Sequence, residues 1–302
     1  MGLNLSGMTT ETRNPRTMQL DQMSPLEIVT VMNEEDARVP LAIAKCLPQI
    51  AQAVTWAAES FEKGGRLFYM GAGTSGRLGV LDAAECPPTF GVPKEMVVGL
   101  IAGGEKAFIE AVEGAEDSRE LAVEDLKAHG LTADDFVVGI AASGRTPYVL
   151  GGLDYAKGVG CHTAAIACNI GSAIGKAAEL AIEVNCGPEV LTGSTRLKSG
   201  TAQKLILNMI STGSMVRTGK AYQNLMVDVQ QTNEKLHTRA ENIVIDATGV
   251  EREKARAAID AAGGSVKTAI TMLLADCDAR EAARRLERAH GHVREAIRLE
   301  VL

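Results

Sequence analysis

The chain has 302 residues, of which 46% are hydrophobic and 23% charged. This is enough apolar material for one good-sized α/β domain and a smaller attachment, so a fully disordered chain is excluded. The formal net charge of −7 and the aromatic content of 3% argue against a nucleic-acid partner. Such partners are bound by Lys and Arg at the phosphates and by rings that stack on bases.

The sequence contains no apolar run of signal-peptide length near its start and no stretch long enough to cross a membrane. We therefore expect a cytoplasmic protein with no membrane partner. The six cysteines show no C-x-x-C spacing and are interpreted as reduced side chains. No metal site is expected, because His290 and His292 have no ligand partners at metal spacing. No cofactor is expected either.

Apolar residues recur at helical spacing from Pro25 to Lys63, which predicts helices that lead into the main domain. Five short apolar runs then alternate with stretches of helical pattern, such as 78–85, 107–129 and 147–159. The predicted strands are Leu67–Met70, Val97–Ile101, Phe136–Ala142, His162–Ala167 and Leu180–Val184. Strands that alternate with helices indicate a doubly wound, five-stranded parallel sheet of the flavodoxin-like kind.

The pattern after Glu189 is interpreted as wholly helical. Two segments near the end, 264–270 and 291–297, share the pattern G-x-V-x-x-A-I, and each follows an Ala- and Arg-rich helix. This weak repeat predicts a small helical bundle, similar to a ubiquitin-associated (UBA) fold. The expected organisation is an N-terminal helical segment over 1–56, a main α/β domain over 57–220 and a C-terminal helical region over 221–302.

The loop after the first strand, residues 71–76, matches G-x-G-x-x-G, the fingerprint of dinucleotide-binding domains. A dinucleotide site also needs an acidic residue at the end of the second strand, but that strand ends in Ala102-Gly103-Gly104. The loop offers the hydroxyls of Thr74 and Ser75 beside glycines at a helix N-terminus instead. This arrangement favours a phosphate monoester.

The loop after the third strand repeats this chemistry with Ser143 and Thr146 around Gly144, followed by Pro147 at the start of a helix. Two such loops in one sheet point to phosphate binding more specifically than either alone. The alternative is that these two hydroxyls only cap the helix. A third hydroxyl-rich segment, residues 189–198, follows the fifth strand and is expected to close over a sugar.

These loops resemble those of the sugar isomerase (SIS) domain: GTSGR at 73–77, SGRTP at 143–147 and PEVLTGSTRLKSGTAQK at 188–204. Three further segments narrow the resemblance to the N-acetylmuramic acid 6-phosphate etherase family. They are TETRNP at 10–15, LDAAECPPTFG at 81–91 and EGAEDS at 113–118. The resemblance extends from about residue 9 to the C-terminus.

The resemblance implies a carbon–oxygen lyase that removes D-lactate from N-acetylmuramic acid 6-phosphate by elimination and then adds water. Such a route needs a base for the C2 proton and an acid for the departing oxygen. Carried over from the family, Glu116 is the base and Glu85 the acid. Apolar residues flank Glu85 in the sequence, and we expect these surroundings to raise its pKa. Glu116 lies in an acidic run that on its own is typical of a solvated helix face.

The resemblance also assigns Ser75, Ser143 and Thr146 to the phosphate, and Thr74, Glu189, Ser194 and Thr195 to the lining of the site. Arg196 and Lys198 stay open, because each fits either an anion ligand or a solvated helix surface. A homodimer is expected, since SIS domains commonly pair.

Two other functions remain as alternatives. A phosphosugar isomerase would use the same loops but needs no acid for a leaving lactate. A sensor like the glucokinase regulatory protein, which resembles this family, would bind phosphosugar without turnover.

Overall fold

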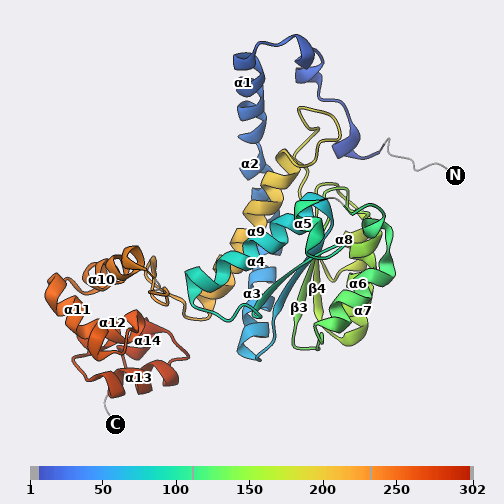
Figure 1. Cartoon of the computed structure of the whole chain (residues 1–302). Coiled ribbons are helices and arrows are strands. Elements are labelled where there is room, and N and C mark those ends of the chain that lie inside the picture. Colours follow the sequence, from blue (N-terminus) through green and yellow to red (C-terminus); the bar gives the residue numbers. More distant parts are fainter. Residues whose placement is uncertain (1–6, 111, 232, 300–302) are drawn as a thin grey trace. The chain divides into compact units, whose positions relative to one another are not determined.

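The computed structural model describes residues 7–110, 112–231 and 233–299 (Figure 1). Contacts between residues divide the chain into two compact units. The larger unit is Met1–Ala84 with Glu95–Ser211, and the smaller unit is Glu85–Lys94 with Thr212–Leu302. The domain boundaries at 57 and 221 stay a prediction. No helix within the described residues combines the length and the apolar character that crossing a membrane requires.

The larger unit contains a parallel five-stranded sheet in the order β2-β1-β3-β4-β5, which confirms the predicted fold class. Each predicted strand agrees with an observed one to within two residues. The strands are β1 (Leu67–Gly71), β2 (Val97–Ile101), β3 (Phe136–Ile140), β4 (His162–Ala167) and β5 (Leu180–Glu183). Because β1 and β3 are neighbours, with Gly71 paired to Ile140, the loops that follow them leave the sheet side by side.

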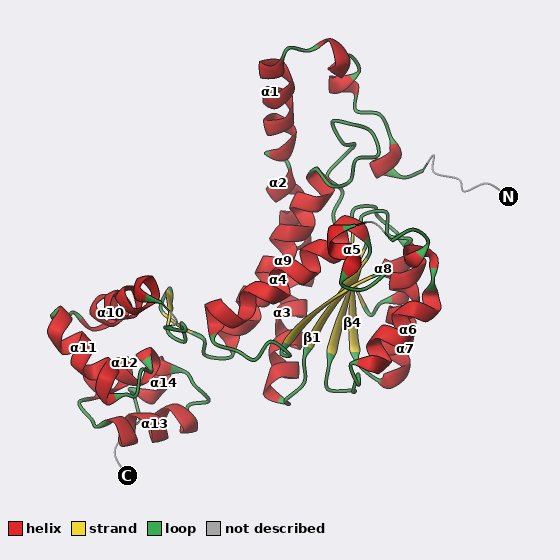
Figure 2. Cartoon of the chain, in the orientation of Figure 1, coloured by secondary structure: helices red, strands yellow, loops and turns green. Residues whose placement is uncertain are grey.

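Helices cover both faces of this sheet (Figure 2). The helices that lie in the larger unit or begin there are α1 (Pro25–Asp36), α2 (Val39–Ile43), α3 (Leu47–Glu62), α4 (Gly73–Phe90), α5 (Lys106–Ile109), α6 (Arg119–Ala128), α7 (Pro147–Val159), α8 (Ala173–Ala177) and α9 (Lys198–Arg217). Burial on two faces explains why the strands are continuously apolar rather than alternating.

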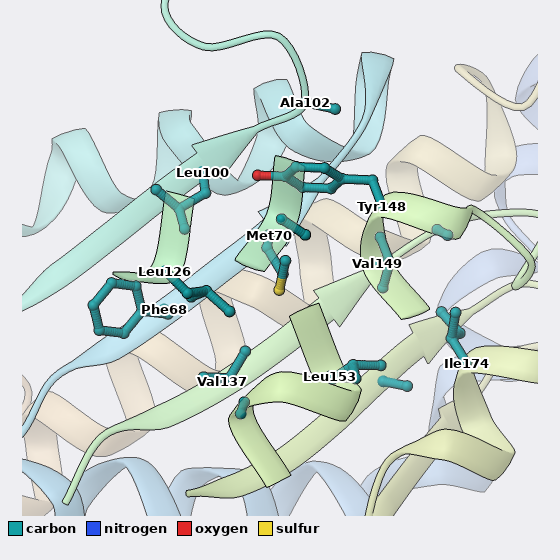
Figure 3. Close-up of a cluster of buried hydrophobic side chains, with 14 of the residues drawn as sticks. Phe68, Met70, Leu100, Ala102, Leu126, Val137, Tyr148, Val149, Leu153 and Ile174 are labelled. Atoms are coloured by element: carbon teal, nitrogen blue, oxygen red, sulfur yellow. The ribbon is translucent and has the colours of Figure 1, made fainter. Parts of the chain in front are cut away.

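Successive side chains of β1 point to opposite faces of the sheet. Phe68 and Met70 join a buried cluster with Leu126 of α6 and Leu153 of α7 (Figure 3). Tyr69, between them in sequence, has its hydroxyl 3.4 Å from the Leu207 carbonyl oxygen of α9, on the other face. The sheet is therefore fixed between two helical layers, and its strand ends hold the loops in defined places.

Two predicted helices have different limits in the structure. The helix predicted over 78–85 extends over the whole of α4, through Pro87 and Pro88 in its last turns. The helix predicted over 107–129 is wrong as a single element, because the chain forms α5, a 3-10 helix at Ala115–Asp117 and α6. α5 ends at Ile109 because Glu110 is extended, with φ −119° and ψ 138°. Gly114, with φ +75°, precedes the 3-10 helix, and Ser118 begins α6 by accepting a hydrogen bond from the Leu121 N–H.

The prediction that the chain is wholly helical after Glu189 is also wrong. A loop precedes α9, and the antiparallel pair β6 (Ala221–Tyr222) and β7 (Leu225–Met226) follows it. The rest of the smaller unit is a bundle of short helices: α10 (Glu234–Thr248), α11 (Arg252–Ala261), α12 (Val266–Ala275), α13 (Ala279–Arg288) and α14 (Val293–Ala296).

The weak sequence repeat supplies the core of this bundle. Its two valines, Val266 and Val293, are the first residues of α12 and α14, and both are buried. The alanines three residues later, Ala269 and Ala296, are fully buried. The repeat therefore marks two equivalent helix starts that pack inward. The likeness of the bundle to a UBA fold stays a prediction.

Candidate active site

The first hydroxyl loop forms the start of α4. Ser75 is 7% exposed, and its Oγ donates to Oε1 of Gln203 on α9 at 3.1 Å. One turn before Gln203, the backbone of α9 passes the same loop, where a Cβ at Gly200 would lie 3.6 Å from Cγ2 of Thr74 and 3.6 Å from the Thr195 carbonyl oxygen. The beginnings of α4 and α9 therefore meet, and they bring Thr74, Ser75 and Thr195 together.

The second hydroxyl loop follows β3. Ser143 and Thr146 are half-buried, and Ser143 Oγ accepts the backbone N–H of Arg145 at 3.3 Å. Thr146 is the residue before α7, yet its side chain makes no capping hydrogen bond. Helix capping therefore does not account for a hydroxyl at residue 146.

Asn169, just after β4, connects the second loop to the N-terminal segment. Its Nδ2 donates to the carbonyl oxygens of Ala142 and Ser143, each at 3.3 Å, and to Oγ1 of Thr10 at 3.0 Å. Thr10 is 1% exposed. Sequence patterns alone did not single out Asn169, although its place directly beyond a parallel strand was a usable signal.

The third segment is organised by Glu189, which is fully buried. Its carboxylate accepts the backbone N–H groups of Lys198 at 3.0 Å and Ser199 at 2.9 Å, as well as the Ser199 hydroxyl at 2.9 Å. A carboxylate there satisfies N–H groups that the first turn of α9 cannot. Glu189 thus anchors the segment that carries Ser194 and Thr195, which are half-buried.

Lys198 corrects an expectation, because it is neither on a solvated surface nor open to an anion. The side chain is 1% exposed, and its Nζ lies 2.6 Å from Oε2 of Glu35 on α1 and 3.0 Å from the Cys186 carbonyl oxygen. Arg196 is exposed.

Glu116 lines a cavity of about 240 Å³ beyond the ends of β1 and β2. Ala72 and Gly73 of the first loop contribute to its wall, as does Arg77 of α4. Arg77 donates from Nε to the Phe108 carbonyl and from Nη2 to the Ala107 carbonyl, both at 2.8 Å. These bonds tie the segment that leads to Glu116 to the first turns of α4.

Glu85 belongs to the smaller unit, whereas Glu116 and the hydroxyl loops belong to the larger one. The Glu85 side chain is exposed on α4, although that of Cys86 beside it is only 2% exposed. The apolar residues that flank Glu85 in the sequence do not enclose it, because successive side chains of a helix point in different directions.

The order of the sheet and the paired hydroxyl loops at neighbouring strand ends agree with the SIS class, which the family comparison shows for the domain. The family model of the glucokinase regulatory protein N-terminal SIS domain matches residues 49–157. A phosphoheptose isomerase from Francisella tularensis superimposes with a TM-score of 0.50 at 18% identity, over 64% of this chain and 100% of the other. A phosphoheptose isomerase from Neisseria gonorrhoeae also superimposes with a TM-score of 0.50 at 18% identity, over 63% of this chain and 98% of the other.

Sequence comparison places the chain within one family of that class. It is 63% identical, over 97% of its length and the full length of the relative, to an N-acetylmuramic acid 6-phosphate etherase of an Exiguobacterium species. Etherases of Serratia proteamaculans and Mycolicibacterium smegmatis are 61% and 58% identical, each over 98% of this chain and 99% of the relative. The chain belongs to the N-acetylmuramic acid 6-phosphate etherase family.

Proposed function

We propose that this protein cleaves the lactyl ether of N-acetylmuramic acid 6-phosphate and releases N-acetylglucosamine 6-phosphate and D-lactate. The reaction belongs to the carbon–oxygen lyases and serves the recycling of cell-wall sugar. The observation that carries the proposal is the identity of about three residues in five with etherases over 97–98% of the chain. The cavity beside Glu116, at the carboxyl ends of the strands, is in keeping with it.

Elimination is the reasonable route, because an ether resists direct hydrolysis. Opening of the sugar ring exposes an aldehyde at C1, which makes the proton at C2 acidic. Removal of that proton and loss of lactate from C3 leave a C2=C3 double bond conjugated to the aldehyde. Water then adds its oxygen to C3, and a proton returns to C2. One group must take the C2 proton, and another must protonate the departing ether oxygen.

Glu116 is proposed as the base at C2, and Glu85 as the acid that assists departure of lactate. The position of Glu116 in a cavity wall beside the first hydroxyl loop supports its role. The exposure of Glu85 leaves its carboxyl accessible to a substrate. Two carboxyls can share acid and base work when their surroundings differ in the bound complex.

The phosphate is proposed to lie against Ser75, Ser143 and Thr146, with Thr74, Ser194 and Thr195 around the sugar. The meeting of α4 and α9 and the adjacency of the loops after β1 and β3 support this set. Glu189 lines the site indirectly, because its carboxylate is engaged by the start of α9. Its proposed contribution is to fix the segment 190–198.

We propose further that the protein is a cytoplasmic homodimer. The six cysteines are all free thiols, which suits a reducing compartment. Leu26 and Val29 of α1 and Leu41 of α2 are 74%, 57% and 70% exposed, and large apolar side chains exposed in this way support pairing with a second copy. Sedimentation of the wild type and of a Leu26→Lys, Leu41→Lys variant tests this, and equal masses at the monomer value would contradict it.

The decisive experiment is to incubate the protein with N-acetylmuramic acid 6-phosphate in the presence of a chelator and to assay D-lactate. We expect the wild type to release lactate and Glu85→Gln and Glu116→Gln to be impaired by about a hundredfold or more. Asp117→Asn is the matched control, since this exposed carboxylate is adjacent to Glu116 and has no proposed role. Binding of the sugar phosphate without lactate release would favour a sensor or an isomerase.

Deuterium exchange separates the two carboxyls. In D₂O, N-acetylglucosamine 6-phosphate should gain deuterium at C2 with the wild type and with Glu85→Gln, because Glu116 alone performs that exchange. Glu116→Gln should not exchange. Equal loss of exchange in both variants would contradict the division of roles.

A further inference from the structure

The amide of Gln203, on α9, lies next to the hydroxyl of Ser75. Gln203 is 1% exposed, and its Oε1 accepts the Ser75 Oγ proton at 3.1 Å. Within the described residues, Nε2 of the same amide is buried and has no hydrogen-bond partner. The amide therefore uses its acceptor but not its donor in the observed arrangement. A buried N–H group without an acceptor is unfavourable.

This hydrogen bond has the wrong direction for phosphate binding. A serine hydroxyl has one proton, and a phosphate dianion offers only acceptor oxygens. While Ser75 donates to Gln203, it cannot donate to a phosphate. A carboxamide has an acceptor and a donor in nearly equivalent positions, so a half-turn of the amide group exchanges Oε1 for Nε2. The hydroxyl proton of Ser75 is then released.

We propose that Gln203 is a positioning residue that sets the direction of the Ser75 proton. In the free protein its Oε1 accepts that proton. When the phosphosugar binds, the amide turns, Nε2 donates to Ser75 Oγ, and the Ser75 proton points to a phosphate oxygen. Nε2 and the phosphate oxygen then each have a hydrogen-bond partner, and Oε1 takes the place that Nε2 held in the free protein. The inference rests on the proposed function, because it takes Ser75 as a phosphate ligand.

Two substitutions of Gln203 remove one or both of these hydrogen-bonding directions. Glutamate in its ionised form only accepts, so Gln203→Glu keeps the hydrogen bond observed in the free protein but holds the Ser75 proton away from the phosphate. Methionine offers neither a donor nor a comparable acceptor. A purely structural link between α4 and α9 would be preserved by an ionised glutamate, whereas the proposed role would not.

The test is steady-state kinetics of lactate release by the wild type, Gln203→Glu and Gln203→Met between pH 6 and 8.5. Phosphate binding is the same in the ground and transition states, so its weakening appears mainly in KM. We expect KM of Gln203→Glu to rise roughly ten- to a hundredfold at high pH, the range for one hydrogen bond to a charged group, with kcat within about twofold. Lys204→Gln, an exposed neighbour on α9, is the matched control.

The pH dependence distinguishes positioning from damage. A protonated glutamate can donate to Ser75, so the KM ratio of Gln203→Glu to wild type should fall as pH is lowered, which a misfolded variant would not show. Arg77 and Asp82 on α4 and Lys198 and Lys204 on α9 are present in both proteins, so the variant and the wild type differ in charge only at residue 203.

A double variant completes the test. Because Ser75 and Gln203 act on one hydrogen bond, KM of Ser75→Ala/Gln203→Glu should match that of Ser75→Ala. A wild-type KM for Gln203→Glu at every pH, or additive effects in the double variant, would overturn the inference. Absence of lactate release by the wild type would instead refute the proposed function.

Discussion

Lys198 and Glu35 form a buried ion pair that connects the start of α9 to α1. Their side chains are 1% and 2% exposed, and the Nζ–Oε2 distance is 2.6 Å. Burial alone would raise the pKa of Glu35, but hydrogen bonds from Lys198 and Arg16 outweigh it, and the pKa lies below its usual value. The Glu35 carboxyl therefore stays ionised near neutral pH, and its bond to Lys198 fixes the helix that carries Gln203.

Replacing Glu35 by Gln should leave the Lys198 ammonium buried without its counter-charge. Such a change typically costs about 3–5 kcal/mol of stability, whereas replacing both partners is far milder. We expect urea unfolding to show this loss for Glu35→Gln and substantial recovery in Glu35→Gln/Lys198→Met. Arg38→Met is the control, because Arg38 contacts the same carboxylate but is 59% exposed. A comparable loss in the control would contradict the role of burial.

Arg77 should affect the turnover rate indirectly, because it holds the segment that leads to Glu116. Its two bonds to the carbonyls of Ala107 and Phe108 fix the chain that leads to Glu116. Arg77→Gln should lower kcat by about tenfold or more, because small displacements of a catalytic group are costly. Deuterium exchange at C2 should fall in parallel. Arg119→Gln, which removes an exposed ion pair with Asp154, is the control and should leave both rates within about twofold.

Gly91 should tolerate no side chain. It has φ +62°, and a Cβ there would lie 2.5 Å from the Asp228 carbonyl oxygen. Gly249 has φ +74°, and a Cβ there would meet nothing within 4 Å, so Gly249→Ala measures backbone strain alone. We expect Gly91→Ala to be less stable than Gly249→Ala by about 1–3 kcal/mol, the usual range for overpacking. Equal melting temperatures for the two variants would show that the close approach is not maintained.

The sheet could be predicted from sequence because each strand is a short apolar run that ends at small or polar residues. A strand that is buried on both faces is apolar at successive positions, so the strand can be recognised from its own residues. The presence of both hydroxyl loops at the carboxyl ends of strands followed from the parallel topology, whereas their neighbouring positions depend on the strand order β2-β1-β3. Helix limits were less accessible: nothing local indicates that α4 continues through Pro87 and Pro88, or that Gly114 adopts a left-handed conformation.

The environment of single polar residues could not be predicted, because it depends on contacts distant in sequence. The buried Lys198 pairs with Glu35, which is 163 positions away in the sequence, and Asn169 hydrogen-bonds to Thr10, which is 159 positions away. Ser75 finds Gln203 across 128 positions. The type of a polar residue is the same in a solvated loop and in a buried hydrogen-bond network, and only the fold distinguishes the two environments.

Asp82 provides a test of pH dependence that is independent of catalysis. The residue is 7% exposed on α4, and its Oδ1 accepts from Nδ2 of Asn208 at 2.6 Å and from Oγ of Ser211 at 3.2 Å. Burial raises the pKa of this carboxyl above its ordinary value of 3.8, and the hydrogen bonds from Asn208, Ser211 and Tyr69 oppose the rise only in part. The folded protein therefore holds the Asp82 proton more tightly than the unfolded chain.

A raised pKa means that the contribution of Asp82 to stability is complete below pH 3.8 and is lost as pH rises through the folded-state value. Asp82→Asn cannot ionise and should lack this loss. We expect the stability of the variant relative to wild type to increase as pH is raised from about 4 towards neutrality, and then to level off above the raised pKa. Melting temperatures of both proteins across this range measure the effect. Parallel curves would show that Asp82 titrates alike in the folded and unfolded chains.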